Sequence, residues 1–130
     1  MATNPGFAST LNDTAGLANA TLDTSLTAPT NITSLTVGGA SGSKVEEIVV
    51  QAVGTTVASV LNIFKYDGAT YHLYFQYLIS ATTSSTTAIA FRTYTQFPNL
   101  YIANGSTLRF SQTVAGNQSM LKLHAAAGNY

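Results

Sequence analysis

The sequence predicts an all-β protein: an antiparallel β-sandwich, jelly-roll-like, with an extended N-terminal arm. Three observations support this fold class. From residue 31 onward, short runs with alternating apolar residues are separated by turn residues at intervals of roughly ten positions. No stretch of this region places its apolar residues at helical spacing. The chain has no cysteine, and 45% of its 130 residues are hydrophobic, which suits one domain with its own core.

Residues 1–30 are the predicted arm and residues 31–130 the predicted sandwich domain. The arm is rich in Ala, Thr and Asn, and its larger apolar side chains are isolated. Ordering such a segment costs roughly 30–60 kcal/mol, whereas burying five such side chains returns only about 10 kcal/mol. We therefore expect the arm to be mobile or to be ordered against a partner. The expected anchors are Phe7, Leu11, Leu17 and Leu22.

The sandwich domain is expected to contain seven or eight strands. The candidate runs are 31–37, 44–53, 57–66, 70–79, 87–95, 100–103, 107–114 and 119–126. Val45 is out of phase with Ile48 and Val50, which predicts a β-bulge near Glu46–Glu47. The dipeptide Asp67–Gly68 predicts a hairpin turn.

Two further expectations concern the runs after this hairpin. Ile89 and Phe91 are expected to point inward from a strand over 87–95. Pro98 is expected to end that strand, because proline lacks the N–H group that a ladder uses.

The stretch "YDGATYHLYFQYLIS" (66–80) contains the most apolar predicted strand. Odd-numbered residues from Tyr71 to Ile79 form its expected core face. A bare edge on such a strand would promote aggregation, so we expect a central position in a sheet. His72, Tyr74 and Leu78 lie on the other face, where outward apolar groups favour an interface between subunits.

Charge and composition narrow the classes of partner. Five basic and five acidic residues give zero net charge, and the basic residues are scattered, so no nucleic-acid partner is expected. No apolar run approaches the roughly 18 residues of a membrane span, and no signal peptide is evident, so we expect folding in a cytosol. The 12 Ser and 20 Thr residues predict a neutral, hydroxyl-rich surface that touches other proteins.

The residues that carry chemistry are few. His72 and His124 lie in predicted strands with no acidic residue close in the sequence, and two histidines lack a third ligand for a metal. Glu46 and Glu47 are adjacent in a strand and would face opposite sides. We therefore expect no enzyme, no metal and no cofactor. A sugar-stacking platform remains possible, although it would lack Trp. Its residues would be Tyr71, Tyr74, Tyr77, Tyr94 and Tyr101.

Several stretches together resemble a family of small tailed-phage virion proteins. They are "NPGFAST...GLANATLDT", "GASGSKVEEIVVQAVGTTVASV", "LNIFKYDGATYHLYFQYLIS" and the terminal "AAAGNY". Where charged residues usually follow the hairpin in that family, this chain has "FQYLI", so its outer face is expected to differ.

The resemblance implies a capsid decoration (cement) protein: a β-sandwich, commonly a homotrimer, with extended arms. Its implied partners are the major capsid protein and further copies of itself. Its implied location is the outer surface of the virion, after synthesis in the host bacterial cytoplasm. Two alternatives remain open. One is a tail or baseplate module, and the other is a carbohydrate-binding β-sandwich on the particle surface.

Overall fold

The computed structural model describes residues 22–30, 32–114 and 120–130 in full, and residues 10–17 by their backbone. All regular structure in these ranges is β-strand, and no helix occurs in them. The strands are β1 (Thr10–Leu17), β2 (Thr33–Val37), β3 (Ser43–Ala52), β4 (Ser59–Tyr66), β5 (Tyr71–Ile79), β6 (Arg92–Ile102), β7 (Thr107–Gln112) and β8 (Leu121–Asn129).

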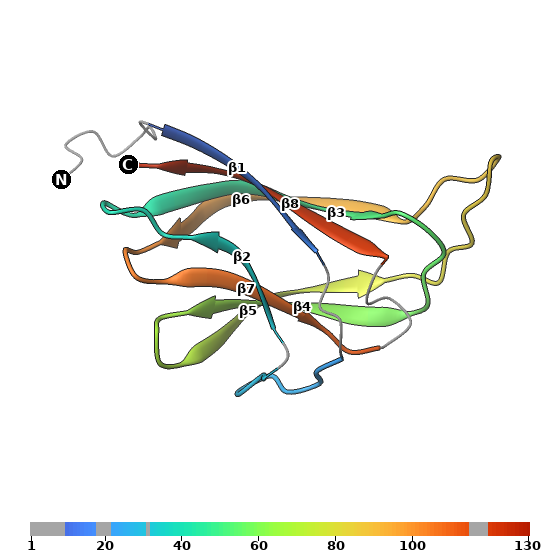
Figure 1. The fold of residues 1–130 in the computed structure, drawn as a ribbon, viewed down its shortest axis with the longest axis horizontal. Helices are drawn as coiled ribbons and strands as arrows, with labels where there is room; N and C mark the ends of the chain where they lie inside the picture. The colour runs from blue at the N-terminus through green and yellow to red at the C-terminus, as the bar shows by residue number, and fades with distance from the viewer. Residues whose placement is uncertain (1–9, 18–21, 31, 115–119) are drawn as a thin grey trace.

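The strands form two antiparallel sheets of four. Sheet A has the order β1-β8-β3-β6, and sheet B has the order β2-β7-β4-β5. Figure 1 shows the two sheets as two layers, with sheet A above sheet B. The predicted all-β, two-sheet architecture is confirmed.

The pairing of strands follows a simple rule along the chain. β4 pairs with β5, β3 with β6, β2 with β7 and β1 with β8. The first four strands are therefore folded back along the last four. Only the β4–β5 hairpin stays within one sheet, and every other connection crosses from one sheet to the other.

The core lies between the sheets and is built from their alternating inner faces. Its largest members include Phe110, Ile48, Leu61, Ile63, Ile79, Leu100, Ile102, Leu108, Leu121 and Leu123. The predicted bulge in β3 is confirmed, because the register against both neighbouring strands shifts between Val45 and Glu47. The shift returns Val45 to the same face as Ile48 and Val50, and all three side chains are fully buried.

The predicted break at Pro98 is wrong. β6 runs without interruption through this residue. β6 is the last strand of sheet A and pairs only with β3. Its register shifts around Pro98, between the pairs Glu47–Gln96 and Val45–Leu100. An edge position beside a register shift needs no N–H donor, so proline is tolerated there.

The inward orientation predicted for Ile89 is also wrong. Its side chain is 89% exposed, and β6 begins only at Arg92. Ile89 belongs to the long connection between β5 and β6, which extends well beyond the sheets at the right of Figure 1.

β5 differs from its prediction in two ways. It is the edge strand of sheet B rather than a central strand. Its pairing with β4 also shifts register between Ile63 and Phe64, which leaves Tyr74 as an extra residue. Such a bulge inverts the alternation of side chains.

The odd-numbered core face is therefore correct only for the second half of β5. Tyr77 and Ile79 are buried in the core and Phe75 packs against it. Tyr71 instead pairs with Tyr66 and stacks on its ring on the outer side of sheet B, with centroids 4.3 Å apart. Leu73 is 38% exposed.

Parts of the predicted arm lie against the sandwich. β1 pairs along its whole length with β8, from Thr10–Asn129 to Leu17–Lys122, so its partner strand belongs to the same chain. Among the expected anchors, Phe7 and the side chains of Leu11 and Leu17 lie outside the described residues.

The segment 22–30 forms a turn around Asp23. The Asp23 carboxylate accepts hydrogen bonds from the backbone N–H of Ser25 (2.9 Å) and of Thr30 (2.7 Å). The Asp23 N–H donates to the Gln112 carbonyl of β7 (2.8 Å), which fixes the segment to sheet B. Leu22 remains 44% exposed beside this turn.

Candidate functional site

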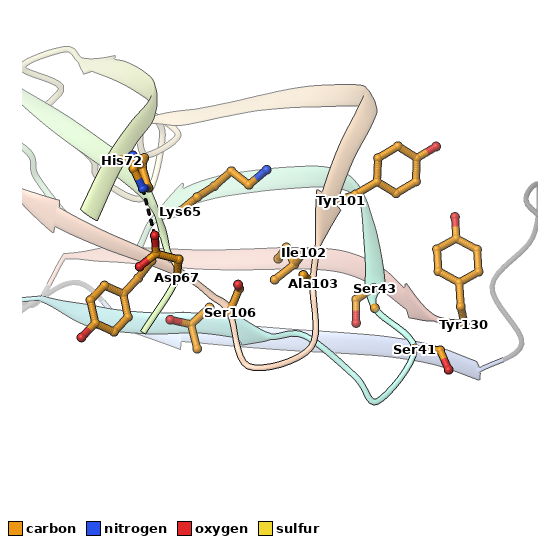
Figure 2. Close-up of a pocket in the computed structure, with 13 residues that line it drawn as sticks. Ser41, Ser43, Lys65, Asp67, His72, Tyr101, Ile102, Ala103, Ser106 and Tyr130 are labelled. Carbon is orange, nitrogen blue, oxygen red and sulfur yellow. Dashed lines mark hydrogen bonds and ion pairs between the residues drawn. The ribbon is translucent and has the colours of Figure 1, made fainter. Parts of the chain in front are cut away.

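An open cleft of about 440 Å³ lies at one end of the sandwich. The β4–β5 hairpin, the β2–β3 connection, the β6–β7 turn and the end of β8 meet there. Figure 2 shows the lining residues, most of which carry polar or aromatic groups. The main ones are Ser41, Ser43, Lys65, Asp67, His72, Tyr101, Ser106, Thr107 and Tyr130.

One wall of this end cleft is the hairpin turn at Asp67. Gly68 has a φ of +98°, a left-handed conformation that glycine adopts without strain in the predicted hairpin turn. One carboxylate oxygen of Asp67 accepts the backbone N–H groups of Thr70 (2.7 Å) and Ala69 (2.9 Å). These two bonds, and then His72, lower the pKa of Asp67 to about 2.

His72 has an acidic partner, contrary to the sequence-based expectation. Its Nε2 atom lies 3.2 Å from the second carboxylate oxygen of Asp67. The dashed line in Figure 2 marks this contact. Both side chains are more than half exposed, at 59% and 51%. The pair is therefore an open carboxylate–imidazole contact at the rim of the cleft.

The opposite wall holds two tyrosines. The rings of Tyr101 and Tyr130 stack with centroids 6.5 Å apart and planes at 29°. The Tyr130 hydroxyl is buried and has no hydrogen-bond partner among the described residues. The Lys44 ammonium lies 5.9 Å from the Tyr101 ring centre and 3.3 Å from Glu46, whose hydrogen bond raises the pKa of Lys44.

Close contacts at Gly38 and at Ser43 shape this end of the sandwich. A side chain at Gly38 would place its Cβ only 2.0 Å from the carbonyl oxygen of Ala103, so the β2–β3 connection can approach the β6–β7 turn only through glycine. Ser43 then joins this connection to β8, because its hydroxyl donates to Asn129 (2.6 Å) and accepts the N–H of Gly39 (2.9 Å).

The chemistry of the end cleft suits a polar ligand. Lys65 extends across it toward Tyr101 in Figure 2. The hydroxyl group of Ser106 lines it on the side of Asp67, and that of Ser41 lines it on the side of Tyr130 (Figure 2). Within the described ranges, no three His, Cys, Asp or Glu side chains gather as a metal site.

The structure separates Leu78 from His72 and Tyr74, the other two residues predicted to share an interface. His72 pairs with Lys65, which also pairs with the core residue Leu108, so His72 belongs to the inner side of sheet B. The ring of Tyr74 turns toward sheet A and lies under the Lys65 ammonium, 5.5 Å away. Leu78 lies on the outer side and is 75% exposed. The bulge at Tyr74 causes this separation.

The five tyrosines of the predicted sugar platform are also dispersed. Tyr77 is in the core, and Tyr71 lies on the outer face of sheet B. Tyr94 is 60% exposed on sheet A, where it pairs with Val49 beside His124. Only Tyr101 lines the end cleft.

Sequence reasoning missed a cluster around Arg109 on the outer face of sheet B. The guanidinium lies 4.3 Å from the centre of the Tyr66 ring and donates a 2.9 Å hydrogen bond to the Tyr71 hydroxyl. The alternation of Arg109 with Leu108 and Phe110 was the signal that it points outward.

Comparison with protein-family models, with curated protein sequences and with solved structures finds no significant match. In the described part of the chain, no helix has the length and apolar character needed to cross a membrane.

Proposed function

We propose that this protein is a structural component of a phage virion, a capsid decoration (cement) protein with a jelly-roll β-sandwich. The observation that carries the proposal is the strand order β1-β8-β3-β6 facing β2-β7-β4-β5. Folding four strands back along four others in this way supports a jelly roll, an architecture frequent in viral capsid and lectin domains. The stretches that resemble small phage virion proteins support the same proposal.

The surface of the protein supports a role in binding other proteins. Leu22 is 44% exposed on the segment beside β7, and Ile89 is 89% exposed on the projecting connection. The net charge is zero. In the proposed mechanism, each copy buries such apolar groups against the major capsid protein on the outside of the head. The stabilisation of the shell then grows with the number of bound copies.

The test mixes purified protein with undecorated heads of the phage that encodes it and images the particles by cryo-electron microscopy. The proposal predicts density at regular lattice positions on the outer surface. A variant without residues 1–9 tests the arm while it keeps every described strand. Leu22→Ala tests a predicted anchor, and Leu26→Ala is its matched control because both leucines are similarly exposed.

The outcomes distinguish the decoration role itself from attachment through the arm. Loss of density with the shortened or Leu22→Ala protein, but not with Leu26→Ala, supports attachment through the arm. Equal density with all variants keeps the decoration role and rejects the arm anchors. Bare heads with every variant reject the decoration role and favour a tail or baseplate location.

A second candidate function is saccharide binding in the end cleft. It is favoured by the exposed ring of Tyr101, the stacked Tyr130 with its buried hydroxyl, and the surrounding serine hydroxyls. Aromatic rings pack against the apolar face of a sugar, while hydroxyl and carboxylate groups bond to its edges.

Titration calorimetry with soluble oligosaccharides of glucose, galactose and N-acetylglucosamine tests this candidate. Saturable binding that Tyr101→Ala abolishes, and Tyr94→Ala retains, supports it. Tyr94 is the matched control because it is exposed on the same strand but lies outside the cleft. Absence of binding to all three classes rejects the candidate for these sugars.

A further inference from the structure

We propose that the free edge of β5 binds the same edge of a second copy of this chain, which joins two B sheets across a two-fold axis. This inference does not depend on the proposed function. β5 is the last strand of sheet B, and no described strand pairs with its outer edge. One row of its backbone N–H and C=O groups is therefore available to another strand.

The other sheet edges carry features that oppose pairing with themselves. β6 has Pro98, which lacks an N–H, next to the middle of the strand. β2 is only five residues long and has a register shift after Ser34. The middle of β1 carries Asp13, so self-pairing would bring two acidic residues together.

The part of β5 that follows its bulge lacks these features that oppose pairing. The segment Phe75–Gln76–Tyr77–Leu78–Ile79 contains no charge, no proline and no glycine. It is a regular segment, because it pairs with β4 without a further shift. Natural edge strands usually carry lysine, proline or a bulge to prevent such pairing. The bulge at Tyr74 protects only the first half of β5.

The chemistry of this edge points to a second copy as the occupant. An antiparallel contact about a two-fold axis near Tyr77 brings uncharged residues opposite uncharged residues, with no like charges to repel. It places Leu78, which is 75% exposed, near Gln76 or Leu78 of the second copy. Such a contact uses the same surface on both partners and closes at two copies. It therefore differs from the homotrimer that the family resemblance implies.

Sedimentation velocity and multi-angle light scattering of the full chain test the proposal. We expect a species with twice the 13.6 kDa mass of the chain. Leu78→Lys places two ammonium groups near the axis and is expected to raise the dissociation constant at least about tenfold. Ile89→Lys is the matched control, since it also puts a lysine at an exposed apolar position, but on the β5–β6 connection rather than on the edge of β5.

Hydrogen exchange gives a second measurement at the level of the backbone. Amides of residues 75–79 are expected to exchange more slowly as wild-type concentration rises, and this dependence disappears in Leu78→Lys. Circular dichroism checks that both variants fold. If the protein remains monomeric at concentrations up to about 1 mM, the proposal is overturned, since the edge contact is then too weak to form a dimer. A trimer, or a dimer that Leu78→Lys leaves intact, overturns it as well.

Discussion

The ring of Tyr74 lies 5.9 Å from the ring of Phe97, so the edge strand of sheet B meets the edge strand of sheet A. Phe97 also meets Phe75 edge-on, with centroids 5.5 Å apart. These rings cover the side of the core between β5 and β6. The contact depends on the bulge in β5, because only the inverted alternation turns Tyr74 toward sheet A.

Replacement of Phe97 by Ala should strongly destabilise the fold. Its side chain is only 6% exposed, and its loss leaves a cavity beside Tyr74 and Phe75. We expect a loss of about 3–5 kcal/mol in the free energy of unfolding, measured by urea denaturation. Tyr94→Ala, at an exposed position of the same strand, should cost under about 1 kcal/mol. Similar losses for both variants would contradict the packing role of Phe97.

The acid stability of the protein should depend on Asp67. Its pKa is lowered from 3.8 to about 2 by the N–H groups of Thr70 and Ala69 and by His72. A lowered pKa contributes stability that is present above pH 3.8 and is lost as the pH falls toward 2. Asp67→Asn should reduce this acid-dependent loss and keep the turn, because Asn–Gly also favours hairpins. The urea midpoint as a function of pH measures the effect, and parallel curves for both proteins would refute it.

Gly38→Ala should be far more damaging than Gly39→Ala. The new Cβ at position 38 would lie 2.0 Å from the Ala103 carbonyl oxygen, a backbone atom that cannot turn away. At position 39 it would meet only the Asn129 side chain, at 3.0 Å. We expect about 3 kcal/mol of destabilisation for Gly38→Ala and under about 1.5 kcal/mol for Gly39→Ala in thermal unfolding. Equal destabilisation by the two substitutions would contradict the close approach of the β2–β3 connection to the β6–β7 turn.

Alkaline pH should destabilise the fold through Tyr77. Burial raises the pKa of its hydroxyl above 10.0, and the nearby Thr95 side chain offsets part of this rise without meeting the geometry of a hydrogen bond. The folded protein then keeps a proton that the unfolded chain releases, so stability falls as pH rises beyond about 10. Tyr77→Phe should flatten this decline in the urea midpoint. If the urea midpoint of the variant falls by the same amount at alkaline pH, titratable groups other than Tyr77 cause the decline.

Local signals predicted much of the strand pattern. Asp67–Gly68 encodes its own turn, and the phase of Val45 against Ile48 is enough to predict the bulge in β3. Both features depend on residues adjacent in the chain, so the sequence displays them directly. The inward orientation of Leu108 and Phe110 follows in the same way.

Features that depend on distant strands could not be read locally. The alternation from Tyr71 to Ile79 is unbroken in the sequence, and only pairing with β4 reveals that Tyr74 is an extra residue. Pro98 suggested the end of a strand, because the sequence does not show that its strand lies at the edge of a sheet, where proline is tolerated. The end cleft brings His72 and Tyr130 together from separate parts of the chain, so the sequence could suggest His72 alone.

The pairing of β1 with β8 has a consequence for synthesis of the protein. β1 leaves the ribosome well before its partner, residues 122–129, which lie more than 100 positions later in the chain. The β4–β5 hairpin needs only local contacts and is able to form early, whereas sheet A lacks β8 between β1 and β3 until residues 121–129 have been synthesised. Closure of this sheet is therefore a long-range step, and chaperones that bind nascent strands can act during the interval between the synthesis of β1 and that of β8.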